Sequence, residues 1–237
     1  MNLLESIHGH SDLVALNEVQ RAELCKEIRD FLVSHISRTG GHLASNLGVV
    51  ELTVALEYCF DLPKDKIIFD VGHQCYAHKL LTGRADRFHT LRHLGGISGF
   101  TNVDESEYDT VTAGHSGPSV SAALGIASAE ALKGSDAVTV AVVGDGSFTN
   151  GMIFEALNNC SGKKLKLIIV LNDNGMSISE NVGGMANYLA KIRSNSAYTG
   201  FKGGLEDVLN KSEVGTKIVR RLKQCKIELK DVRNVFI

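Results

Sequence analysis

Two apolar runs that each end in a polar turn constrain the fold of this chain more than any other feature. Residues 137–143 lead into Gly144-Asp145-Gly146, and residues 165–171 lead into Asn172-Asp173-Asn174. Between Gly146 and Asn172 lie 25 residues, which is room for one helix and a return strand. Because crossovers of this kind are right-handed, we expect both turns at the same edge of a parallel sheet.

A third apolar run, residues 66–71, precedes the segment GHQ, and the stretches between the runs carry apolar residues at helical spacing. Apolar β-branched strands that alternate with helices are typical of a parallel sheet covered on both faces. The sequence therefore predicts an α/β fold with a mostly parallel sheet and helices on both faces. The helices are expected at residues 17–38, 47–60, 119–132 and 150–159.

The turns at the strand ends carry the residues expected to do chemistry, because ligands bind such sheets beyond the carboxyl ends of the strands. Asp145 offers a carboxylate oxygen and Asn174 an amide oxygen. Magnesium takes such oxygens and completes its octahedron with phosphate oxygens and water. The helix after GDG should also direct its N-terminus toward an anion. Alone, GDG would indicate only a tight turn, but the two turns together indicate a magnesium and diphosphate site.

Composition excludes several other classes of function. The formal net charge is -2, which gives no reason to expect nucleic acid or an anionic membrane surface as a partner. Five cysteines are present and none is spaced as CxxC, so reduced thiols in a cytoplasmic protein are expected rather than disulfides or a zinc site. No secretory signal and no apolar stretch of ~20 residues is present, so no membrane association is expected.

The order and spacing of these motifs resemble a known enzyme family. GDG, 25 residues and NDN form the diphosphate and magnesium motif of thiamine diphosphate enzymes of the transketolase type. TGGHLASNLGVVELTVAL, DVGHQCYAHKLLTGR, ESEYD, TAGHS and NDNGMSISENVG are similar to segments of 1-deoxy-D-xylulose-5-phosphate synthases. The similarity runs from the first helix to about Arg193 and more loosely to the end of the chain.

The resemblance implies a role for particular residues. Asp145, Asn174 and the backbone oxygen of Met176 would bind magnesium, and His42 would face the reacting carbon and assist substrate binding or proton transfer. Contacts to thiamine diphosphate would come from a larger set, namely His73, Gly114, His115, Ser116, Asp145, Gly146, Ser147 and Asn174.

The resemblance also implies an activity. Pyruvate and D-glyceraldehyde 3-phosphate would condense to 1-deoxy-D-xylulose 5-phosphate and carbon dioxide, which feeds isoprenoid, thiamine and pyridoxal synthesis. The family would act as a homodimer, or this chain would act in a complex with a chain that carries the pyrimidine-binding domain. Two alternatives remain open, namely the N-terminal subunit of a split transketolase-like enzyme and a truncated fragment without activity.

The chain departs from the family pattern in places. Gly175 stands where a glutamate is usual, Gly117-Pro118 replace small hydroxyl residues, and Thr101-Asn102-Val103 replace a stretch with a proline and basic residues. Residues 1–200 would form the cofactor-binding domain, and residues 201–237 a connecting segment or a basic helical tail that could also bind a partner or a membrane. The pyrimidine-binding and C-terminal domains, and the later strands of the sheet, are expected to be missing, so the chain reads as truncated.

Overall fold

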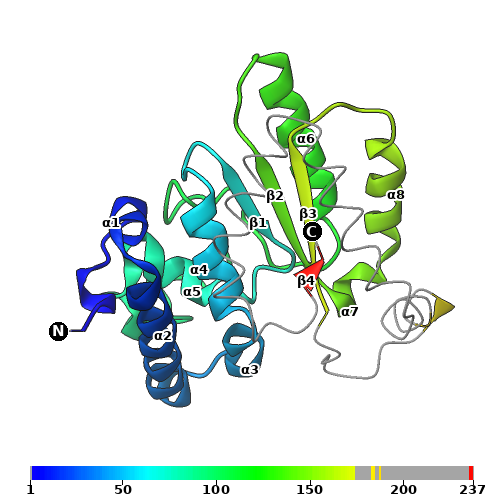
Figure 1. Ribbon diagram of the computed structural model, residues 1–237. Coiled ribbons are helices and arrows are strands. Elements are labelled where there is room, and N and C mark those ends of the chain that lie inside the picture. Colours follow the sequence, from blue (N-terminus) through cyan, green and yellow to red (C-terminus); the bar gives the residue numbers. More distant parts are fainter. Residues whose placement is uncertain (1, 174–182, 185–186, 188–234, 237) are drawn as a thin grey trace.

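A parallel sheet forms the centre of the molecule (Figure 1). The computed structural model describes residues 2–173, 183–184, 187 and 235–236. Strands β1 (Lys66–Phe69), β2 (Thr139–Gly144) and β3 (Leu167–Asn172) lie side by side in that order, and all three are parallel. These are the three predicted runs, with ends that differ from the prediction by at most two residues.

A fourth strand corrects one expectation. Strand β4 (Val235–Phe236) pairs antiparallel with β3, with Leu171 opposite Phe236 and Asn172 opposite Val235. The sequence had suggested that no strand after the connecting segment completes the sheet, and this short strand shows that prediction to be wrong at one edge. Apart from β4, the predicted basic tail lies outside the described residues.

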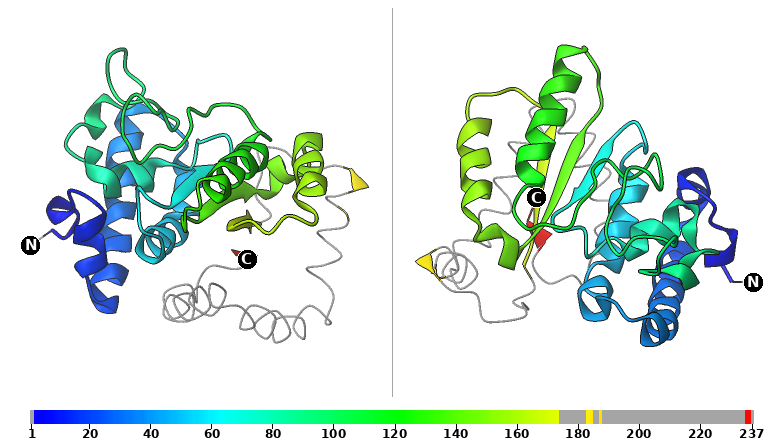
Figure 2. Two further views of the ribbon diagram at one scale, coloured as in Figure 1. Left: turned by 90° about the horizontal axis from the view of Figure 1, so that it is seen from above. Right: turned by 180° about the vertical axis from the view of Figure 1, so that it is seen from behind.

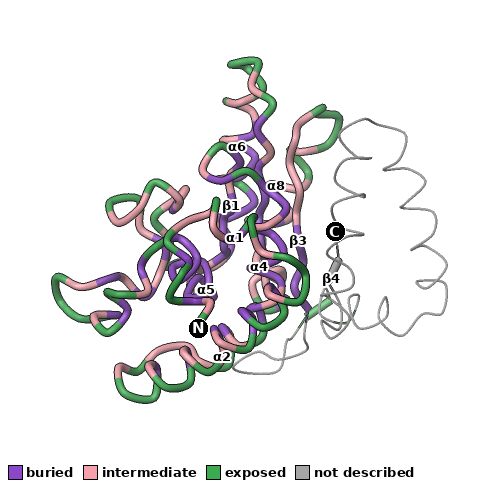
Figure 3. Tube along the Cα trace, turned by 60° about the vertical axis from the view of Figure 1, so that its left-hand side comes forward, coloured by how far each residue is buried: buried purple, intermediate pink, exposed green. Residues whose placement is uncertain are grey.

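Alternate residues of each strand face two separate apolar cores. Ile67, Phe69, Val140 and Val142 belong to a large core on one face, whereas Ile68, Ala141 and Val143 belong to a smaller core on the other. This is the two-residue period of a strand with both faces buried. The tube in Figure 3 accordingly shows buried backbone along β1, β2 and the helices against them.

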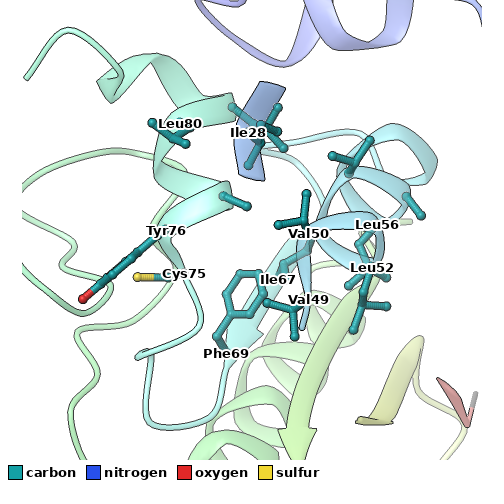
Figure 4. Packing of buried hydrophobic residues seen from close by; sticks show 14 of the residues in the cluster. Ile28, Val49, Val50, Leu52, Leu56, Ile67, Phe69, Cys75, Tyr76 and Leu80 are labelled. Carbon is teal, nitrogen blue, oxygen red and sulfur yellow. The ribbon is translucent and has the colours of Figure 1, made fainter. Parts of the chain in front are cut away.

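Helices cover both faces of the sheet, as predicted (Figures 1 and 2). Helices α6 (Ser119–Leu132) and α8 (Gly151–Cys160) pack over the smaller core. Figure 4 shows the larger core, where α2 (Glu18–Thr39) and α4 (Val50–Cys59) pack toward β1. The remaining helical segments are η1 (Leu4–Ser6), α1 (His10–Ala15), α3 (Leu43–Leu47), α5 (Tyr76–Lys79), η2 (Leu80–Arg84), η3 (Phe88–Thr90) and α7 (Asp145–Phe148).

Local signals fix both ends of α2. Asn17 and Gln20 form a reciprocal capping box at the start of this helix, and Gly40, with φ of 73°, ends it. The glycine pair therefore separates α2 from α3, which begins at Leu43 within the GGHLASN segment. No helix of the described residues is long and apolar enough to cross a membrane.

Candidate active site

The carboxyl ends of the three parallel strands bring the predicted turns together. Gly144 at the end of β2 is the register partner of Asn172 at the end of β3, so GDG and NDN begin side by side. The backbone N–H of Asp70, just after β1, donates to the carbonyl of Val142 at 2.8 Å. Asp70, Asp145 and Asp173 follow the three strands and are 3%, 5% and 1% exposed, so a row of nearly buried carboxyls lines this edge.

The GDG segment differs from the predicted plain turn. Asp145 begins the one-turn helix α7, which ends at Phe148, and a separate helix α8 starts after Asn150. The side chain of Asn150 caps α8 by accepting from the N–H of Met152 at 3.0 Å. The helix predicted at residues 150–159 is therefore α8, and α7 is an additional turn of helix before it. Gly146 is exposed and Ser147 is half-buried.

Two of the three predicted histidines meet in the structure. The rings of His42 and His73 are 5.5 Å apart between centroids and nearly perpendicular, at 77°. The hydroxyl of Tyr76 lies 3.5 Å from Nδ1 of His42. Among the described residues, the buried Nδ1 of His73 has no hydrogen-bond partner, so its hydrogen-bonding capacity is unused there.

The environment keeps both imidazoles neutral near pH 7. Burial lowers the pKa of His42, and the charge of Arg92 lowers it further. Burial also lowers the pKa of His73 and the nearby His42 adds to this effect, while Asp70 opposes it. A neutral imidazole can donate from one nitrogen and accept at the other, which suits proton transfer.

The GHS segment reaches the same edge through a different set of contacts. The N–H of Gly117 donates to the Asp70 carboxylate at 2.9 Å, and the Asn150 side chain donates to the carbonyl of Ser116 at 3.2 Å. Apart from its chain neighbours, no described residue lies within 4 Å of the position that a Cβ on Gly114 would occupy. His115 is exposed, and no hydrogen bond or ring contact of the described residues joins it to His42 or His73.

A close backbone approach ties the GHQ turn to the segment before GHS. Gly72 has φ of 79°, and a Cβ there would lie 2.8 Å from Cβ of Ala113 and 3.2 Å from the backbone nitrogen of Thr101. A larger residue would push these segments apart, which explains glycine at this position. The departure at Thr101-Asn102-Val103 therefore lies against the GHQ turn.

Of the three predicted magnesium ligands, only Asp145 lies among the described residues. Asn174, Gly175 and Met176 lie outside the described residues. In the part of the chain that is described, no three His, Cys, Asp or Glu side chains gather as a metal-binding group. A site built from one carboxylate, one amide and one backbone oxygen does not require such a group, and the buried carboxylate of Asp145 fits it.

Several residues that sequence reasoning did not single out shape this site. Asp70 holds the GHS segment, Tyr76 faces His42, Asn150 holds Ser116, and Asn46 contacts both histidine segments. The sequence signal that could have identified them is a polar residue next to an apolar strand or helix. Asp70 directly follows a buried strand, and Asn46 stands one helical turn after His42.

Comparison with protein families gives one match over almost the whole chain. The family model described as 1-deoxy-D-xylulose-5-phosphate synthase matches residues 4–236. A curated protein of that name from Desulforudis audaxviator is 52% identical over 231 residues, which cover 97% of this chain and 36% of the relative. One from Lachnoclostridium phytofermentans is 53% identical and covers 96% of this chain and 37% of the relative.

The chain thus spans about a third of the length of the curated relatives it matches. Among solved structures, a transketolase from Leishmania mexicana matches with a TM-score of 0.61 at 24% identity, covering 72% of this chain and 30% of that one. A transketolase from Pichia stipitis matches with a TM-score of 0.62 at 22% identity, covering 67% and 27%. These two likenesses show a shared fold.

Proposed function

The chain belongs to the 1-deoxy-D-xylulose-5-phosphate synthase family, and from that premise we propose that it forms the diphosphate-binding part of such an enzyme. The whole enzyme would condense pyruvate with D-glyceraldehyde 3-phosphate, giving 1-deoxy-D-xylulose 5-phosphate and carbon dioxide. The names of the curated relatives favour this reaction over that of a transketolase-like enzyme.

One observation supports the proposal more than any other. The GDG and NDN segments start from register partners of neighbouring parallel strands, Gly144 and Asn172. Two oxygen donors on these segments can therefore reach one cation, which in turn binds a diphosphate. A second observation agrees. Within the described part of the chain, Nδ1 of His73 has no hydrogen-bond partner and no non-neighbouring atom lies within 4 Å of a Cβ on Gly114, and both residues belong to segments that the family resemblance assigns to the cofactor.

The proposal assigns the site residues of this chain to binding or to proton transfer. Asp145, Asn174 and the Met176 carbonyl oxygen would hold magnesium. His73, Gly114-His115-Ser116, Gly146 and Ser147 would hold thiamine diphosphate. Thiamine diphosphate, when bound, supplies the carbon centre and the electron sink for the loss of carbon dioxide from pyruvate.

His42 would handle a proton of the substrate. Its neutral ring, half-buried against His73 and Phe100, can donate a proton to a substrate oxygen or take one from it. The hydroxyl of Tyr76 near Nδ1 would orient the ring. Because burial lowers the pKa of His42, the ring is ready to act as a base at pH 7.

The proposal extends to partners and to place in the cell. A homodimer, or a complex with a chain that carries the pyrimidine-binding domain, would supply the rest of the enzyme. A cytoplasmic location fits the free thiols of Cys75 and Cys160.

Calorimetry with magnesium and thiamine diphosphate tests the proposed site. The sample is the chain together with the part of the enzyme that its relatives add. Asp145→Ala should weaken the binding of the cofactor with magnesium by at least about tenfold, because a carboxylate that binds a cation contributes more than about 1.4 kcal/mol. Asp136→Ala is the matched control, since Asp136 is an exposed carboxylate paired with Lys64. Equal affinity in both variants would sink the assignment of Asp145.

A further inference from the structure

A fully buried asparagine links the two histidine segments of the proposed site. Asn46 is 0% exposed and lies on α3, four residues after His42. Its side-chain nitrogen, Nδ2, donates one hydrogen bond to the carbonyl oxygen of His42 at 2.8 Å and another to that of His73 at 2.7 Å. The backbone N–H of Tyr76 donates to the side-chain oxygen of Asn46 at 2.9 Å.

These three bonds join backbone groups that lie far apart in the sequence. His42 directly precedes α3, while His73 lies in the turn after β1 and Tyr76 is the first residue of α5. The donor and acceptor pattern also settles the orientation of the amide, because only its nitrogen can face two carbonyl oxygens. A second link runs parallel to the first, since the side chain of Gln74 donates to the carbonyl of Ser45 at 3.2 Å.

Only an amide fits between these groups. A carboxylate of the same shape would turn an oxygen toward both carbonyls and could not donate. An apolar side chain would leave the carbonyl of His73 and the N–H of Tyr76 without their partner, while the carbonyl of His42 would keep only the backbone N–H of Asn46. Each such group costs about 1–3 kcal/mol when it stays buried, so the segments would separate to admit water. Separation would end the contact between the imidazoles of His42 and His73, which are now 5.5 Å apart.

We propose that Asn46 is a positioning residue that sets the backbones of His42 and His73 and so holds the two imidazoles against each other in the active site. Asn46 touches neither imidazole by hydrogen bonds, and it acts through the two main-chain carbonyls. Its importance for catalysis rests on the proposed function, whereas the contact itself is a property of this chain alone.

Histidine NMR of the isolated chain tests the proposal. In a sample with labelled histidine rings, Asn46→Ala should move the ring signals of His42 and His73 together. The pKa of both rings should rise toward the ordinary value of about 6.5, because water reaches them. The charges that face them, Arg92 and Asp70, are unchanged in this variant. Thr53→Val is the matched control, since Thr53 is 0% exposed and its hydroxyl has no hydrogen-bond partner among the described residues.

Two outcomes would overturn the proposal. The first is a folded Asn46→Ala variant whose His42 and His73 signals and pKa values match those of the Thr53→Val control. The second applies to the unchanged protein and decides the matter if Asn46→Ala does not fold. Both side-chain amide protons of Asn46 should exchange with solvent about 100-fold or more slowly than those of a free amide. Exchange at the free rate would contradict the two hydrogen bonds that Asn46 donates.

A further sample separates this proposal from the proposed function. Thiamine diphosphate with magnesium chloride, added to the chain together with the part its relatives add, should shift the His73 signals. If those signals do not move, the cofactor assignment fails, while the effect of Asn46→Ala on the two rings still stands or falls by itself.

Discussion

At the scale of single residues, the candidate site combines a nearly buried carboxyl group, Asp145, with two imidazoles whose pKa values are lowered. Asp145 is the proposed magnesium ligand, and burial disfavours a positive charge on His42 and His73. A metal-binding carboxylate beside neutral imidazoles is typical of sites that bind an anionic cofactor and also transfer protons. Removal of the His42 side chain should distinguish proton transfer from cofactor binding.

Replacing His42 by alanine in the complete enzyme should lower kcat by about 100-fold to 10,000-fold, the usual contribution of a general acid or base. The affinity for thiamine diphosphate should stay within about threefold, because the proposed cofactor contacts come from other segments. Steady-state kinetics and calorimetry on the same sample measure both quantities, with the exposed His89→Ala as control. Normal turnover at saturation with strongly weakened cofactor binding would instead place His42 in the cofactor site.

Gly117 gives a prediction about stability. Its φ is 100°, and a Cβ there would lie 2.5 Å from Cγ of Asn150. Gly117→Ala should therefore lower the free energy of unfolding by about 2 kcal/mol or more. In Gly117→Ala with Asn150→Ala, the combined loss should be smaller than the sum of the single losses, because the collision is gone.

Urea unfolding of the four proteins in this cycle measures the effect. Gly125→Ala is the control, since Gly125 lies within α6 and no described residue outside this helix lies within 4 Å of its missing Cβ. Alanine there should stabilise the helix by about 0.5–1 kcal/mol. If Gly117→Ala is as stable as Gly125→Ala, the GHS segment does not have the conformation described.

At the scale of elements, a buried network of charges fastens the ESEYD segment to α5 and η2. Three cations, His78, Lys79 and Arg84, face three anions, Glu57, Glu105 and Asp109. Both ring nitrogens of His78 face carboxylate oxygens, Glu57 at 2.7 Å and Asp109 at 3.1 Å, so both nitrogens donate and the ring carries a charge. Asp109 also accepts from the N–H of Asn102 at 2.8 Å, which ties the network to the loop that contacts the GHQ turn.

The charge of His78 makes stability depend on pH. Burial alone would lower the pKa of His78, but the carboxylates of Glu57 and Asp109 outweigh burial and raise it. A raised pKa in the folded state means that the stabilisation is complete below the unfolded value of about 6.5 and is lost as the pH rises through the folded value. Glu57→Gln keeps an acceptor for the ring and removes one charge, so the pKa of His78 should fall.

NMR titration of His78 and urea midpoints between about pH 6 and pH 9 measure this effect. The fall in midpoint with rising pH should be smaller in Glu57→Gln than in the unchanged protein. Glu51→Gln on the same helix is the control, because Glu51 pairs with Arg29 away from this network. An unchanged pKa of His78 in Glu57→Gln would refute the ion pair.

The sequence predicted the elements whose signal is periodic and local. The three strands and helices α2, α4, α6 and α8 all appear, since each shows an apolar pattern of the right period over enough residues. The short helices α3, α5 and α7 were not predicted, because a segment of four or five residues has too few positions to show a period. GDG was expected to be a turn, yet its aspartate begins a helix.

The site was predictable to a similar degree. The strand-end turns and the pairing of GDG with NDN followed from topology, and the meeting of His42 with His73 was implied only by family resemblance. The partners of these residues were out of reach, because Asn46, Asp70 and Asn150 act over separations of 27 to 47 residues that leave no local pattern.

At the scale of the whole molecule, the described residues form two apolar cores, and the chain covers about a third of its relatives' length. Binding the diphosphate would fix only one end of the cofactor, and the family resemblance assigns the carboxylate that activates the other end to a separate domain. We therefore expect the 237-residue chain alone to release no carbon dioxide from pyruvate, measured as product formation with magnesium and thiamine diphosphate present. Turnover of about 1 s⁻¹ or faster would contradict this division of labour.

The central claim is that this chain can serve as the diphosphate-binding part of a 1-deoxy-D-xylulose-5-phosphate synthase. The most direct measurement uses a chimera in which residues 4–236 replace the matching segment of the Desulforudis audaxviator enzyme, which is 52% identical. The rate of 1-deoxy-D-xylulose 5-phosphate formation from pyruvate and D-glyceraldehyde 3-phosphate is then followed. The account predicts product that requires both thiamine diphosphate and magnesium and that disappears in Asp145→Ala. A folded chimera that forms no product, or that forms it equally well with Asp145→Ala, would contradict the account.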